Sequence, residues 1–145
     1  MDIGKMMLRL KKVAEELGLP LGERKKTYNS RLAQELAKWA ESKGRGDEFH
    51  DAVFRAYFVD GRNIGKREEL VALATSIGLP AEEAKEILQS RAFRDAVDFD
   101  WAKSHQMSIT AVPTFLIDKQ AVVGAQPYEV LEQFLKANGV KKRGS

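Results

Sequence analysis

The residue types that most often carry catalysis are sparse in this sequence of 145 residues. It contains no cysteine and only two histidines, His50 and His105. Without cysteine, the chain offers no thiolate nucleophile, no disulfide and no thiolate metal ligand. The histidines are far apart in the sequence and have no cysteine beside them, so they do not form a usual zinc ligand set. We therefore expect neither a metal site nor a catalytic cysteine in this chain.

The remaining polar residues do not assemble into a recognisable catalytic motif either. Asp98 and Asp100 lie two residues apart in a helical pattern, so their side chains point to different sides of the helix. That spacing is poor for a general acid–base pair. Ser30 has no histidine beside it in the sequence to activate its hydroxyl group. Neither a phosphate-binding glycine loop nor a nucleophile elbow is present.

The composition is typical of one soluble globular domain. Hydrophobic residues make up 43% of the chain and charged residues 31%, with both signs mixed along it. The net charge of +3 is matched by the basic run at residues 141–143, and no sustained basic patch predicts a nucleic-acid partner. No apolar run is long enough to span a membrane. Basic residues interrupt the N-terminal segment, whereas a secretory signal has an uninterrupted apolar stretch. We therefore expect a cytoplasmic protein without a membrane partner.

Apolar residues at three- and four-residue spacing predict a mostly helical chain. The expected helices cover about residues 5–17, 30–43, 47–60, 67–77, 81–90 and 92–106. Asn29 or Ser30 is suited to cap the second helix, and Asp47 to cap the third. The third helix is the most aromatic segment of the protein. A packed core is the simpler interpretation of its aromatic stripe, and an aromatic ligand site is the alternative.

The pattern changes to that of a β-hairpin after residue 107. Residues 108–117 are β-branched and apolar, residues 118–119 form a turn, and residues 120–123 form a return strand. Pro127 then opens a last helix. A two-stranded hairpin is marginally stable alone, and its edges are open to pairing. We therefore expect either that helices cover this hairpin or that strands from elsewhere pair with it. A second copy that paired through the exposed strand edge would give a homodimer.

Three stretches together resemble a known family. They are residues 27–33, residues 54–65, and residues 109–115 with 123–127. This set is similar to the DsbA-like thioredoxin-fold family that includes FrnE-type dithiol–disulfide isomerases. More distant members are 2-hydroxychromene-2-carboxylate isomerases and kappa-class glutathione transferases. The resemblance implies an α/β fold that is mostly helical. It implies a single domain, 1–145, with an insertion-like helical segment, 1–107, and the C-terminal half of a thioredoxin fold, 108–145.

The resemblance also implies an activity that this sequence lacks the means to perform. The family's first half, with its Cys-x-x-Cys motif, has no counterpart here, so no catalytic residue is assigned. The resemblance implies a thiol–disulfide oxidoreductase or isomerase that acts on a peptide or thiol substrate, in a truncated form that is inactive alone. A non-catalytic binding or dimerising module on the same fold is the alternative. No cofactor is expected: relatives use glutathione, but here Pro127 removes one helix-start amide and no acidic residue is placed to hold a peptide amine.

Five residues are candidates for substrate binding on the strength of this resemblance: Val112, Pro113, Asn29, Ala125 and Gln126. Pro113 matches the family's cis-proline, which presents the backbone of the preceding residue to an extended substrate. A trans proline at a strand edge is the alternative. Asn29 matches a residue at the mouth of the family's site, and a helix cap is its alternative.

Overall fold

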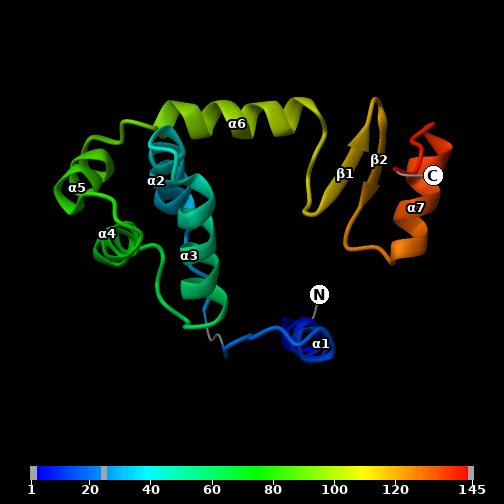
Figure 1. Cartoon of the computed structure of the whole chain (residues 1–145), viewed down its shortest axis with the longest axis horizontal. Helices are drawn as coiled ribbons and strands as arrows, with labels where there is room; N and C mark the ends of the chain where they lie inside the picture. The colour runs from blue at the N-terminus through cyan, green and yellow to red at the C-terminus, as the bar shows by residue number, and fades with distance from the viewer. Residues whose placement is uncertain (1–2, 24–25, 144–145) are drawn as a thin grey trace. The chain divides into compact units, whose positions relative to one another are not determined.

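The structure is a computed structural model that describes residues 3–23 and 26–143. The chain divides into two compact units, Met1–Asp98 and Phe99–Ser145. The elements, labelled in Figure 1, are α1 (Ile3–Glu16), α2 (Arg31–Ser42), α3 (Gly46–Phe58), α4 (Arg67–Ser76), α5 (Ala81–Ser90), α6 (Arg94–Gln106), β1 (Thr114–Ile117), β2 (Gln120–Val123) and α7 (Tyr128–Ala137). The prediction of a mostly helical α/β protein is confirmed. None of the helices in the described ranges is long and apolar enough to cross a bilayer.

The core of the first unit lies between α2, α3, α4 and α5. Helix α2 packs against the other three, and α4 packs against both α3 and α5. The largest side chains that these helices bury completely are Trp39, Phe49, Leu36, Leu70 and Leu88. Burial of each such side chain contributes about 1.5–3 kcal/mol relative to its exposure. This packing explains why the three- and four-residue apolar spacing located these helices.

The ends of these helices follow local backbone rules with one exception. Gly44 and Gly78 follow the C-cap residues of α2 and α4 and adopt positive φ angles of 73° and 87°, a conformation that glycine reaches without a steric penalty. The predicted cap at Asp47 is wrong, because α3 begins at Gly46 and Arg45 occupies the N-cap position. Asp47 instead lies in the first turn of α3, where its negative charge interacts favourably with the positive end of the helix dipole.

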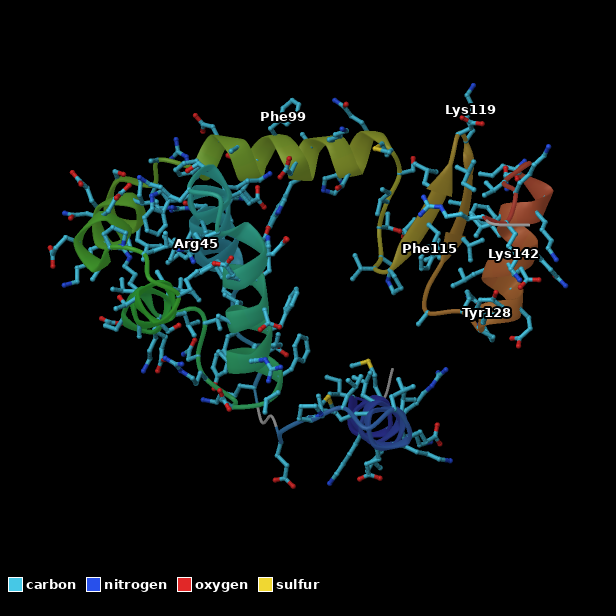
Figure 2. All side chains as sticks on the ribbon, in the orientation of Figure 1. Arg45, Phe99, Phe115, Lys119, Tyr128 and Lys142 are labelled. Carbon is cyan, nitrogen blue, oxygen red and sulfur yellow. The ribbon has the colours of Figure 1, made fainter. Side chains whose placement is uncertain are left out.

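The second unit contains the hairpin and α7. Strands β1 and β2 pair antiparallel, with Thr114 opposite Val123 and Ile117 opposite Gln120. Figure 2 shows Lys119 at the tip of this hairpin. Only the last four residues of the expected strand 108–117 form β1, because Pro113 has no backbone N–H to donate to the ladder. No residue in the range 99–143 is buried.

Candidate functional site

The Val112–Pro113 peptide bond is cis and lies immediately before β1. Two hydrogen bonds hold this turn in place. The backbone N–H of Gly124 donates to the carbonyl oxygen of Pro113 at 2.8 Å. The hydroxyl group of Thr114 donates to the carbonyl oxygen of Ala111 at 2.6 Å. The end of the hairpin therefore fixes the backbone on both sides of Val112. We call residues 111–114 the proline loop.

Val112 is the most exposed large apolar residue of the described chain, with 89% of its surface accessible. Within the described range 99–143, its backbone N–H and carbonyl groups form no hydrogen bond. A backbone segment with free donors and acceptors next to a strand is the feature that an extended polypeptide pairs with by strand addition. The proline loop therefore offers one donor and one acceptor at a defined position.

Ala125 and Gln126 lie across the hairpin end from the proline loop. The side-chain amide of Gln126 donates to the carbonyl oxygen of Val123 at 2.9 Å, so it closes the turn that follows β2. Ala125 is exposed, and Pro127 occupies the N-cap position of α7. These residues and the proline loop therefore belong to one local structure in the second unit.

Asn29 belongs to the first unit and caps α2. Its side-chain oxygen accepts a hydrogen bond from the backbone N–H of Arg31 at 2.8 Å. Ser30 stands at the N-cap position, but its side chain makes no capping bond. Asn29 thus satisfies the first backbone N–H of α2 from the position before the N-cap. Asn29 lies in the first unit, whereas the proline loop lies in the second.

An aromatic pocket on α2 and α3 is a second candidate site. It has a volume of about 450 Å³, within the range of about 300–1000 Å³ that ligand pockets usually have. Its wall is mostly apolar and includes Tyr28, Phe49, Phe54, Tyr57 and Phe58. A few polar groups, among them Ser30, Gln34 and His50, join this wall. Such a site suits the apolar part of a substrate.

This pocket corrects part of the sequence interpretation. A packed core was the simpler interpretation of the aromatic stripe of α3, with a ligand site as the alternative, and Phe49 is indeed buried. However, Phe54 and Phe58 are 58% and 42% exposed. The signal was the width of the stripe: His50, Phe54 and Phe58 follow one another at four-residue steps on a different side of α3 from Phe49. The ring centroids of His50 and Phe54 are 6.3 Å apart, and those of Phe54 and Phe58 are 6.4 Å apart.

One buried carboxylate could be mistaken for a catalytic group. Glu35 is only 2% exposed and accepts hydrogen bonds from Arg91 at 2.7 Å and 2.6 Å and from Arg31 at 2.9 Å. These bonds, above all those from Arg91, lower the pKa of Glu35, although burial opposes them. A carboxylate that stays ionised between two guanidinium groups is a poor proton acceptor. Its role is to join α2 to the end of α5.

Comparison with known proteins decides the family. Residues 2–136 match the DSBA-like thioredoxin domain. The chain belongs to this family. It is 32% identical over 112 residues to the uncharacterized protein YwbO of Bacillus subtilis, a match that covers 77% of this chain and 56% of YwbO. It is also 29% identical over 86 residues to the ClpXP adapter protein SpxH of Halalkalibacterium halodurans, covering 54% of this chain and 28% of SpxH.

Two solved structures share the fold. A probable DsbA oxidoreductase, SCO1869 of Streptomyces coelicolor, is similar with a TM-score of 0.75 and 33% identity, over 91% of this chain and 58% of that protein. A 2-hydroxychromene-2-carboxylate isomerase gives the same TM-score at 20% identity, over 94% of this chain and 66% of that chain. This second likeness concerns the fold alone. The chain spans little more than half the length of YwbO and of SCO1869.

The chain has no cysteine. The described residues include no group of three or more histidine, aspartate or glutamate side chains arranged to hold a metal ion. The chain itself therefore supplies no thiol group for thiol–disulfide exchange.

Proposed function

We propose that this chain is the substrate-positioning part of a thiol–disulfide oxidoreductase or isomerase of the DsbA-like family, and that it is inactive alone. The free backbone of Val112 at the proline loop is the observation that carries this proposal. An extended substrate adds to this backbone as a short strand. Membership in the DSBA-like family and the likeness to SCO1869 support the reaction class. A cytoplasmic location stays a prediction.

The chemistry of the complete reaction assigns this chain a limited role. A thiolate attacks one sulfur of a substrate disulfide, a mixed disulfide forms, and the second substrate sulfur leaves as a thiolate. The attacking thiol comes from outside this sequence, because the chain contains no cysteine. The proline loop holds the substrate backbone during this exchange, and the aromatic pocket takes an apolar side chain of a substrate.

Binding of an unfolded polypeptide tests this role without requiring turnover. The probe is a dye-labelled, reduced and carboxymethylated polypeptide, whose blocked thiols exclude covalent capture, and the readout is fluorescence anisotropy. Replacement Val112→Pro deletes the backbone N–H, whereas Val112→Ala keeps it. The proposal predicts binding by the wild type and Val112→Ala, and loss of at least about threefold with Val112→Pro, the worth of one hydrogen bond. Absence of binding by the wild type, or equal affinity of both variants, would contradict it.

A non-catalytic self-associating module is the second candidate, and the second unit gives it a specific basis. The hairpin has only two strands, and no residue in the range 99–143 is buried. A second copy paired through the β1 edge would extend the sheet and cover apolar residues such as Phe115. Light scattering after size exclusion distinguishes the candidates. Replacement Leu116→Pro removes a backbone N–H from the β1 edge. A wild-type dimer that this replacement converts to a monomer favours the self-associating module, and a monomeric wild type rules the module out.

A further inference from the structure

Helix α1 carries its apolar side chains on one continuous face. At 3.6 residues per turn these side chains fall within an arc of roughly 120°. They are Ile3, Met6, Met7, Leu10, Val13 and Ala14. Leu8 is the one large apolar residue on the opposite face, and it is 69% exposed. None of the residues of α1 is buried.

The apolar face of α1 is covered only in part by its own unit. The following loop, with Leu19 and Leu21, joins Phe58 and this face around a cleft of about 250 Å³. Even so, Leu10 is 46% exposed. An apolar face of this width that stays half exposed along a whole helix marks an interaction surface.

Charge indicates which kind of surface the helix fits. Helix α1 contains four basic residues, Lys5, Arg9, Lys11 and Lys12, and two acidic ones, Glu15 and Glu16. On the helical spacing, Arg9 and Lys11 border the apolar arc on its two sides. Long basic side chains in these positions lay their alkyl stems along the apolar surface and extend their charges to anionic headgroups.

We propose that α1 lies in the plane of an anionic lipid surface, with its apolar face inserted at the headgroup boundary. A second copy is the less favourable occupant, because pairing along this face brings the basic borders of the two helices together. The expectation of no membrane partner rested on the lack of a spanning segment, and a helix that lies on a bilayer needs none. Lipid binding by α1 is independent of the substrate-positioning function proposed above.

Co-sedimentation of the full chain with lipid vesicles tests this inference. One set of vesicles contains phosphatidylcholine and phosphatidylglycerol in equal parts, and the other contains phosphatidylcholine alone. The chain should bind the anionic vesicles, with an affinity that falls as salt is added, and bind the neutral vesicles at least about tenfold more weakly. The double variant Arg9→Gln/Lys11→Gln should lose about 30-fold on the anionic vesicles, because each basic residue contributes about fivefold at such a surface.

A matched pair of leucine substitutions separates insertion from general charge attraction. Leu10→Gln alters the apolar arc and should weaken binding at least about tenfold, the worth of one buried leucine. Leu8→Gln makes the same change on the opposite face and should leave binding unchanged. Circular dichroism checks that both variants stay folded, which the absence of buried residues in α1 leads us to expect. Equal losses in the two variants, no binding to anionic vesicles, or a dimer-to-monomer change with Leu10→Gln would each overturn the proposal.

Discussion

Glu35 and Arg91 form a two-point ion pair in which both carboxylate oxygens of Glu35 accept hydrogen bonds from the one guanidinium group, at 2.7 Å and 2.6 Å. Arg91 adopts a left-handed conformation directly after α5, with φ of 55°. Arg31 reaches from α2 to the same carboxylate and to Asp98 of α6, at 2.9 Å and 2.7 Å. The buried carboxylate thus joins α2, the end of α5 and, through Arg31, the start of α6.

Replacement Glu35→Gln should lower the free energy of unfolding by about 1–3 kcal/mol, because the amide removes the negative charge and replaces one of the two accepting oxygens with a donor that faces the guanidinium groups. Urea denaturation followed by circular dichroism measures the change. Glu82→Gln is the matched control: it also removes a carboxylate paired with a cation, but this side chain is 88% exposed and should change stability by less than about 0.5 kcal/mol. Similar losses in both variants would show that the ion pair has no special role.

The same carboxylate makes stability depend on pH. The hydrogen bonds from Arg91 and Arg31 hold the pKa of Glu35 below its ordinary value of 4.5 in the folded chain. The unfolded chain therefore binds the proton more readily. The stability from this pair is fully present above the ordinary pKa and is lost as the pH falls through the lowered one. Denaturation series at decreasing pH should show a steeper loss below about pH 4.5 in the wild type than in Glu35→Gln; parallel curves would contradict this.

Two phenylalanines of α3 should respond differently to truncation. Phe49→Ala removes a fully buried ring and should cost about 3–5 kcal/mol of stability. Phe54→Ala removes a ring that is mostly exposed at the aromatic pocket and should cost less than about 1 kcal/mol. The second variant should instead weaken binding of a neutral apolar dye such as N-phenyl-1-naphthylamine. Thermal unfolding and dye titration of both variants test this, and a large loss of stability in Phe54→Ala would make its ring a core residue.

The chain alone should not catalyse thiol–disulfide exchange. In an insulin reduction assay with dithiothreitol, the turbidity should rise at the rate of the reaction without protein, because the chain has no thiol to form a mixed disulfide. A related enzyme with an intact Cys-x-x-Cys motif serves as the positive control. Acceleration by a pure preparation of this chain would refute the assigned role.

The sequence predicted most of the helices because their apolar spacing matches the burial that the structure shows. It failed where tertiary context decided the outcome. Asp47 has a good capping side chain, yet Arg45 occupies the cap position because α3 begins one residue earlier, at Gly46. The strand before Thr114 was overextended because β-propensity does not record that Pro113 cannot donate to the ladder.

The candidate site was only partly accessible to sequence reasoning. The resemblance to a family identified Val112, Pro113, Ala125 and Gln126, which the structure brings to one end of the hairpin. The sequence left the aromatic stripe of α3 open between a packed core and a ligand site, because a buried stripe and an exposed one have the same period. Only the angular width of the aromatic face on α3 distinguishes them. The Glu35–Arg91 pair joins residues 56 positions apart, and no local pattern predicts such a contact.

The most direct test of the account is a residue-by-residue NMR titration of the ¹⁵N-labelled chain with a reduced, carboxymethylated polypeptide. The account predicts that the largest amide shifts lie at Val112, Thr114 and Gly124, the N–H groups in and beside the proline loop, and that Val112→Pro reduces the shifts at the other two. Saturable shifts confined to other surfaces, or none at saturating polypeptide, would contradict the claim that this chain positions a substrate through its proline loop.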